Sequence, residues 1–203
     1  MAEENDETMD DLGFSSYKFF TPENGAILLA NEITPESAAR VVDELLFADA
    51  EGVDDIILFI NSPGGDAYGT IMILDTIQMI KTPVTGIVSG IAASGAFYAL
   101  EACDRRIMTK HSYLFWHQLI TSPGDISNKV EMSKVVKRYE KLNEKFEEFL
   151  RDRAKISVTN WKKHFQSDND IYFDATEALN LNLIDEVMAL TKNPKKYAKV
   201  EKK

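Results

Sequence analysis

Ser94 lies at the centre of a segment whose residue types could support nucleophilic chemistry. An apolar, β-rich run over residues 82–89 predicts a buried strand before it, and apolar residues recur at helical spacing after it. Small residues surround the serine: Gly90, Ala92, Ala93, Gly95 and Ala96. A substrate carbonyl could therefore reach Ser94, and the backbone N–H of Gly95 could face the developing oxyanion. The alternative is that Ser94 only caps the helix, which is the common use of a serine at a helix start.

A serine nucleophile needs a general base, and His117 is the histidine that suits this role best. It directly follows the apolar run at residues 113–116, which predicts a strand, so its imidazole should stand at a strand end. His111 and His164 have charged neighbours, and we expect both at the surface. A purely structural role for His117 is the alternative.

The third candidate element is the segment Asn61-Ser-Pro-Gly-Gly65. It follows a run at residues 56–60 that is apolar on both faces, which is typical of a buried parallel strand. Adjacent glycines let the backbone come close to a ligand. A tight strand-to-helix turn without any function is the alternative.

The elements that must position these residues repeat along the chain. Strands are predicted at residues 26–30, 56–60 and 84–88, and each is followed by a predicted helix. The period of about 28 residues indicates a spiral of stacked β/α units, in which each strand is buried against the next. Further short strands are predicted at residues 171–173 and 183–187, on either side of a short helix.

A long amphipathic helix is predicted at about residues 126–153. Its apolar positions step by four, three, four and three residues: Val135, Tyr139, Leu142, Phe146 and Phe149. This stripe fits a core helix and a projecting helix that packs against another subunit equally well. In the second case we expect the stripe to be buried at least partly between subunits, because exposed apolar patches of this size favour association.

The composition excludes several classes of function. The chain has 203 residues, 44% of them hydrophobic, and a net charge of −10, which argues against nucleic-acid binding. Cys103 is the single cysteine, so no intrachain disulfide can form. The acidic N-terminus is unlike a signal peptide, and no apolar run approaches the ~18 residues that span a membrane. We expect a cytoplasmic protein with an acidic and aromatic arm at residues 1–22, one catalytic domain at 23–190 and a basic tail at 191–203.

Four motifs, taken in their order and spacing, resemble the proteolytic subunit of the Clp protease (caseinolytic serine protease) family. They are Phe59-Ile-Asn-Ser-Pro-Gly-Gly65, Gly90-Ile-Ala-Ala-Ser-Gly-Ala96, His117-Gln118 and Asp170-x-Tyr-Phe-x-Ala-x-Glu-Ala178. The resemblance covers about residues 26–189. It implies a catalytic triad of Ser94, His117 and Asp170, and an oxyanion hole formed by the backbone N–H groups of Gly64 and Gly95. It also implies substrate contacts by Gly65, Asp66, Gln118, Leu119 and Ile120, without a metal or other cofactor.

The same resemblance implies a fold and an assembly. The fold class is α/β, a crotonase-like spiral of ββα units with a long projecting handle helix at about residues 126–153. The handle helices would join subunits of a homo-oligomer, either a seven-membered ring or two stacked rings. Such a ring acts as a serine endopeptidase on peptides or unfolded proteins and can take an AAA+ unfoldase as partner, although the peptidase subunit itself needs no ATP.

Three departures from the family pattern bear on these expectations. Acidic residues 1–13 stand where the family has a hydrophobic pore segment, which puts unfoldase docking in question. Asn169 stands where the family often has an arginine beside the catalytic aspartate, and Gly95 stands where it often has a methionine. Two other functions stay open: a crotonase-like acyl-CoA enzyme, and a non-catalytic ring subunit that regulates an active paralogue.

Overall fold

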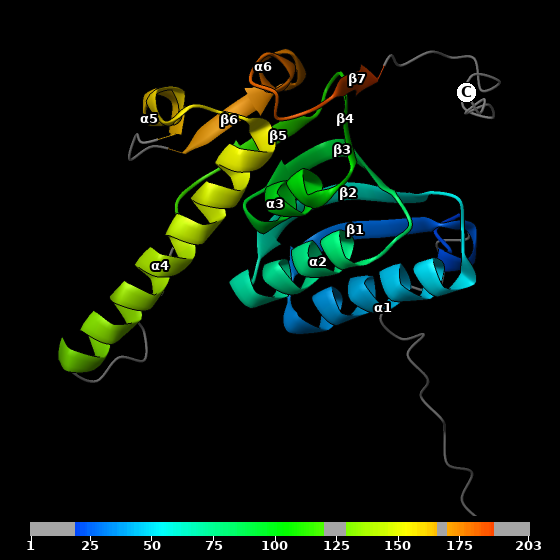
Figure 1. Cartoon of the computed structure of the whole chain (residues 1–203), viewed down its shortest axis with the longest axis horizontal. Helices are drawn as coiled ribbons and strands as arrows, with labels where there is room; N and C mark the ends of the chain where they lie inside the picture. The colour runs from blue at the N-terminus through cyan, green and yellow to red at the C-terminus, as the bar shows by residue number, and fades with distance from the viewer. Residues whose placement is uncertain (1–18, 120–128, 166–169, 189–203) are drawn as a thin grey trace, which may run out of the picture.

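A computed structural model of the chain describes residues 19–119, 129–165 and 170–188. Seven strands in this part of the chain form one sheet (Figure 1). Five lie in the order β1 (Ala26–Ile33), β2 (Ile56–Gly65), β3 (Val84–Ala93), β4 (Arg105–Thr109) and β7 (Glu186–Met188), and each neighbouring pair is parallel. The other two are β5 (Tyr113–Trp116), which pairs in parallel with β3, and β6 (Ile171–Asp174), which pairs antiparallel with β5.

The predicted alternation of strand and helix is confirmed. The helices α1 (Pro35–Glu51), α2 (Ala67–Met79) and α3 (Gly95–Ala102) follow β1, β2 and β3, and they lie side by side along the sheet (Figure 1). The Thr34 hydroxyl caps α1 by accepting the Ser37 N–H at 3.1 Å, with Pro35 at the first helical position. A short 3-10 helix, Pro22–Asn24, precedes β1. The fold is the α/β spiral that the sequence predicted.

The Asn61–Gly65 segment is not the strand-to-helix turn that its composition predicts. It forms the last five residues of β2, and its glycines pair with the end of β1, Glu32 with Gly64 and Ile33 with Gly65. The strand can continue because the ladder shifts by a bulge, and because Gly64 and Gly65 have φ of 82° and 151°. The helix begins only after Asp66, whose carboxylate accepts the Gly69 N–H at 2.6 Å.

Strand β3 is also longer than predicted, and it changes its neighbour half-way along. Its first half, to Val88, pairs with β4, and its second half, from Ile91 to Ala93, pairs with β5. Gly90 stands at the branch with φ 115°, where a Cβ atom would lie 2.3 Å from Asn61 Oδ1. Asn61 Oδ1 also accepts the Ile91 N–H at 3.2 Å, so the polar end of β2 holds the branch in place.

The long helix α4 (Lys129–Ala154) is a core helix over one half of its length and a projecting helix over the other, so each of the two alternatives describes part of it (Figure 1). Phe146, Leu150 and Ala154, in its C-terminal half, are buried in the core of their own chain, and the Phe146 ring lies 4.5 Å from that of Tyr98. The N-terminal half extends away from the sheet and exposes Val130, 67% accessible. The prediction of a stripe shared between subunits is therefore wrong for Phe146, because its own chain already covers it. The other four stripe residues are partly exposed.

Two short helices, α5 (Val158–Phe165) and α6 (Ala175–Asn180), complete the fold beside β5 and β6. Trp161 and Phe165 of α5 meet the buried Trp116 ring edge-to-face at 6.0 and 5.4 Å, and Phe165 in turn packs against Phe173 of β6 at 5.4 Å. The Trp116 Nε1–H donates to the Tyr98 hydroxyl at 2.9 Å, which ties the end of β5 to α3.

The N-terminal aromatic residues are described from Phe19. Phe19 is 89% exposed, whereas the Phe20 ring meets Phe59 edge-to-face at 5.2 Å, as a segment that docks on its own domain would. Residues 1–18 of the acidic arm, Ile120 and the whole predicted tail at residues 191–203 lie outside the described residues. Within the described ranges, no helix combines the length and apolar character needed to cross a bilayer.

Candidate active site

The carboxyl ends of β2, β3 and β5 meet around one cavity of about 640 Å³. Each end supplies one of the residues singled out in the sequence, namely Gly64, Ser94 and His117. Predicted site residues Gly65, Asp66 and Leu119 line the same cavity. The opposite wall comes from α4, through Arg138, Tyr139 and Leu142. The structure thus brings together residues more than 70 positions apart in the chain.

Ser94 forms the sharp corner between β3 and α3. Its φ of 51° and ψ of −121° lie in a region that a residue with a side chain rarely adopts, and its N–H donates to the Phe115 carbonyl at 2.8 Å. The side chain makes no capping hydrogen bond to α3, so the alternative of a simple helix-capping serine is wrong. A strained serine on a strand-to-helix corner, with its hydroxyl not used by the helix, is the arrangement of a nucleophile elbow.

Glycine is required at position 64 because the chain approaches the nucleophile so closely there. With φ 82°, an added Cβ would lie 2.5 Å from the Ala93 carbonyl oxygen, 2.7 Å from the Gly95 nitrogen and 2.8 Å from Ser94 Cβ. The Gly64 N–H donates to Ser62 Oγ at 3.1 Å. Its part in an oxyanion hole stays a prediction, and that role would require this N–H to turn away from Ser62.

Gly95 is the first residue of α3, where a backbone N–H has no acceptor within its helix. Its amide therefore adds to the positive end of the helix dipole beside Ser94. A Cβ on Gly95 would lie 2.2 Å from Thr70 Oγ1, and that hydroxyl donates to the Asp66 carbonyl at 2.9 Å. Thr70 thus fills the space beside the nucleophile that a larger residue at position 95 would need.

The ring of His117 is held by packing and by one hydrogen bond. It lies 5.4 Å from the Phe115 ring, which in turn lies 4.5 Å from Tyr172. Its Nδ1 is 2.5 Å from the carbonyl oxygen of Gln118, and since a carbonyl only accepts, Nδ1 carries the proton. The neutral imidazole then has its lone pair on Nε2, the nitrogen that a general base uses in a serine triad.

Asp170 and His117 each lie one residue beyond the antiparallel β5–β6 ladder, and no hydrogen bond or ion pair joins their side chains. The last paired residues are Trp116 and Ile171, and a continuation of this register by one step would place His117 opposite Asp170. Asp170 is exposed, and among the described residues it is not part of the cavity wall. Its role as the carboxylate that orients the imidazole stays a prediction, as do the roles of Gln118, which is exposed, and Ile120.

Sequence reasoning missed part of the cavity wall. Tyr68 and Glu32 lie on either side of the glycine motif, and Arg138 comes from α4. Tyr139 and Leu142 belonged to the predicted apolar stripe, but helical spacing alone does not show which turns of a 26-residue helix face a site.

Comparison with known proteins identifies the family. A model of the Clp protease family matches residues 14–191, which is most of the chain. The chain belongs to the Clp protease family. It is 35% identical over 167 residues to the ATP-dependent Clp protease proteolytic subunit 2 of Synechococcus sp. (strain CC9605), covering 80% of this chain and 82% of that protein.

Other Clp proteolytic subunits are similarly close. The subunit of Streptococcus mutans serotype c is 33% identical over 165 residues, which is 80% of this chain and 83% of that protein. Subunit 1 of Prochlorococcus marinus (strain MIT 9312) is 35% identical over 175 residues, which is 84% of this chain and 86% of that protein. Membership of the Clp protease family supports a peptidase, and it makes the acyl-CoA enzyme that shares this type of fold the weaker alternative.

Proposed function

We propose that the chain is a serine endopeptidase in which Ser94 is the nucleophile, His117 the general base and then acid, and Asp170 the residue that orients His117. The observation that carries this proposal is that Ser94 and His117 both line one cavity. The Ser94 hydroxyl is not used by its helix, and the imidazole has its Nδ1 already bonded, so Nε2 is the nitrogen left for the serine.

The reaction follows from these positions. Nε2 of His117 takes the Ser94 hydroxyl proton as Oγ attacks the peptide carbonyl carbon. The oxyanion forms beside the Gly95 N–H at the positive end of α3, where a preorganised donor stabilises the developing charge. The imidazolium then gives its proton to the leaving amine as the peptide C–N bond breaks, which leaves an acyl ester on Ser94 Oγ. Nε2 next takes a proton from water as the water oxygen attacks the ester carbon, and returns that proton to Ser94 Oγ as the ester bond breaks and the acid is released. Asp170, which would lie opposite His117 if the β5–β6 register continued, would accept the hydrogen bond of the Nδ1–H in place of the Gln118 carbonyl and stabilise the imidazolium without taking the proton.

The cavity suits an extended polypeptide that runs between β2 and α4. One wall is backbone, from Gly64 to Asp66, and the other is the side of α4 that bears Tyr139. Main-chain hydrogen bonds to an extended substrate tolerate many sequences, which suits peptides and unfolded proteins. The Leu119 N–H now donates to Asn143 Oδ1 of α4 at 3.3 Å, so a substrate strand on this side would compete with that bond.

The assembly forms part of the same proposal. The projecting half of α4 exposes Val130 and Val136, which a second subunit would cover. A homo-oligomeric ring, seven-membered and open to stacking on a second ring, agrees with this surface and with the family resemblance. The names of the relatives describe subunits of ATP-dependent proteases. In this protein the ATP would be hydrolysed by an AAA+ unfoldase partner, since the peptidase subunit itself needs none. We place the protein in the cytoplasm.

Labelling with a fluorophosphonate, which reacts with activated serines, tests the proposal. We expect one equivalent of label per chain, attached to Ser94, and loss of both labelling and peptide hydrolysis in Ser94→Ala and His117→Ala. Ser89, an exposed serine on the strand that leads to Ser94, provides the matched control, because Ser89→Ala should label normally. An acyl-CoA enzyme or a non-catalytic ring subunit would take up no label at Ser94. Hydrolysis at the wild-type rate by Ser94→Ala would end the serine-peptidase proposal.

A further inference from the structure

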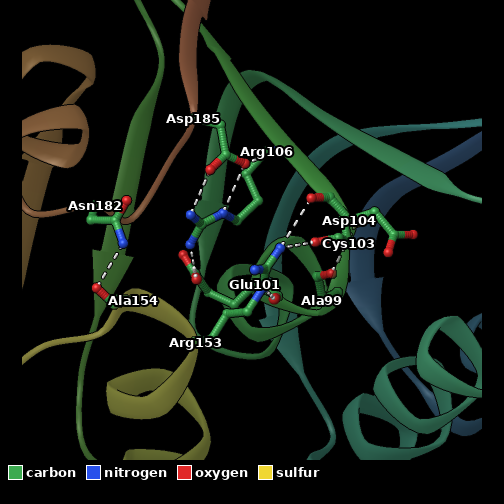
Figure 2. A network of polar contacts seen from close by, with 9 residues as sticks. All are labelled: Ala99, Glu101, Cys103, Asp104, Arg106, Arg153, Ala154, Asn182 and Asp185. Atoms are coloured by element: carbon green, nitrogen blue, oxygen red, sulfur yellow. Dashed lines mark hydrogen bonds and ion pairs between the residues drawn. The ribbon is translucent and has the colours of Figure 1, made fainter.

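The last turn of α4 reaches the far end of the nucleophile helix. The guanidinium of Arg153 donates to three backbone carbonyls at and just beyond the end of α3 (Figure 2). Its Nε donates to the Glu101 carbonyl at 2.9 Å, and its Nη2 donates to the carbonyls of Cys103 at 2.5 Å and Asp104 at 3.2 Å. Helix-end carbonyls have no partner within the helix, so Arg153 is a cap for α3 that comes from another element.

A second arginine fixes the same end of α3 from the other side (Figure 2). The side chain of Glu101 is fully buried, and its Oε2 accepts a hydrogen bond from Arg106 Nη1 at 2.6 Å. Arg106, 2% exposed, also donates to the Asp185 carboxylate at 2.8 and 3.2 Å. The C-terminal end of α3 is therefore bound by side chains from β4 and α4, and Arg106 of β4 is itself held by Asp185 from the segment before β7. Buried, charge-assisted bonds of this kind restrict movement more than apolar contacts do.

The other end of α3 is the reactive end. The helix has eight residues, so it is about 12 Å long and behaves as a short rigid rod. Ser94 and the Gly95 N–H stand at its start, and the Phe146 ring of α4 packs on Tyr98 in its middle. A shift or tilt at the Arg153 end would move the amide that faces the oxyanion. The Arg153 cation also neutralises the negative end of the helix dipole. The positive electrostatic potential that the helix produces at Ser94 is therefore reduced less by that negative end.

We propose that Arg153 is a positioning residue for the reaction at Ser94: it acts through α3, by holding the helix in place and by cancelling the negative end of its dipole. The proposal rests on Ser94 being the nucleophile. It differs from a general stabilising role, because it concerns the reactivity of molecules that are fully folded.

The experiment measures how fast each variant reacts, separately from how much of it is folded. A fluorophosphonate time course gives an amplitude, which counts the folded and competent chains, and a rate constant, which reports the reactivity of the serine in them. In Arg153→Gln we expect the rate constant to fall roughly two- to fivefold, the range set by losing a charge at a helix end. Arg153→Lys keeps the charge but not the planar fork, so its rate constant should lie between those of Arg153→Gln and wild type.

Arg151→Gln is the matched control. It removes the same charge from the same last turn of α4, and Arg151 is not part of the network around α3, so the wild-type rate constant is expected. A wild-type rate constant in Arg153→Gln, even with a reduced amplitude, would reduce Arg153 to a structural residue and overturn the proposal, as would an equally slow Arg151→Gln. Should Arg153→Gln fail to fold, Arg153→Lys decides alone: a slower rate supports the proposal and an unchanged rate overturns it. If the wild-type chain takes up no label at all, it is the proposed function that fails.

Discussion

Replacing Gly64 by alanine would test whether this glycine positions the nucleophile. The new Cβ would lie 2.5 to 2.8 Å from three atoms around Ser94, one of them the Gly95 nitrogen, so the backbone must move. Left-handed φ at a residue with a Cβ costs about 1–2 kcal/mol, and overpacking about 1–3 kcal/mol more. The chain offers a matched variant in Gly52→Ala, since Gly52 has φ 70° but no atom within 4 Å of its added Cβ. The difference between the two variants isolates the contact with the nucleophile.

We expect Gly52→Ala to lose about 1–2 kcal/mol of unfolding free energy and to keep the wild-type kcat/KM. Gly64→Ala should lose more stability, and its kcat/KM per folded chain should fall by about 10²–10³, the cost of displacing one oxyanion donor. The assays are chemical unfolding for stability and hydrolysis of a fluorogenic peptide, normalised by the fluorophosphonate amplitude. A kcat/KM for Gly64→Ala within a factor of about two of Gly52→Ala would refute the assignment of Gly64 to the site.

Three further predictions address the orientation of His117, the buried carboxyl and the handle helix. Asp170→Asn should lower kcat by less than the ~10⁴-fold typical of a triad aspartate, because the Gln118 carbonyl already holds the tautomer; a loss as complete as that of Ser94→Ala would contradict this. Burial raises the pKa of Glu101 to about 8 against the pull of Arg106, and its Oε1 has no partner among the described residues, which also favours the protonated form. In the unfolded chain this carboxyl has its ordinary pKa of 4.5, so between pH 4.5 and about 8 only the folded chain keeps the proton. The unfolding free energy should therefore fall by about 1.4 kcal/mol per pH unit over that range. Glu101→Gln should remove this slope, and parallel pH profiles of stability for the two proteins would contradict the prediction. Phe146→Ala should lower the unfolding free energy by about 3–5 kcal/mol at any protein concentration, because this ring is buried in its own chain. Val136→Ser should leave the unfolding free energy unchanged and weaken assembly, as measured by sedimentation. If Phe146→Ala instead lost assembly without losing stability, the Phe146 ring would lie at a subunit contact.

Much of the scaffold follows from local pattern. The strand at Ile56 could be predicted because its residues are apolar on both faces, as a strand covered on two sides requires. The start of α1 at Pro35 could be predicted because Thr34 supplies the cap and proline needs no N–H there. Ser94 could be placed on a strand-to-helix corner for similar reasons, since small residues and a change of period mark the junction.

Buried charge is what local pattern could not predict. Charged residues are rarely buried unless paired, so Glu101 and Arg106 would be assigned to the surface. Both are buried because each supplies the other's hydrogen bond and because Asp185, 79 residues further on, completes the set. The contact of Arg153 with the end of α3 spans some 50 residues in the same way. Such partners become visible only when the helices are packed.

The pairing of Ser94 with His117 depends on the same kind of distant contact. Sequence pattern places each residue at the end of a strand, but two strand ends share a site only if the strands are neighbours. β3 and β5 become neighbours because β3 leaves β4 at Gly90. Asn61 holds this branch from one strand. The Ser112 hydroxyl holds it as well, because it accepts the Gly90 N–H at 3.3 Å and donates to the Val88 carbonyl at 2.8 Å. Asn61 is the first residue of the glycine motif at the end of β2. The motif therefore has two separate effects on the site: its glycines let the chain approach Ser94, and its asparagine holds the branch that places the strand of His117 beside the strand of Ser94.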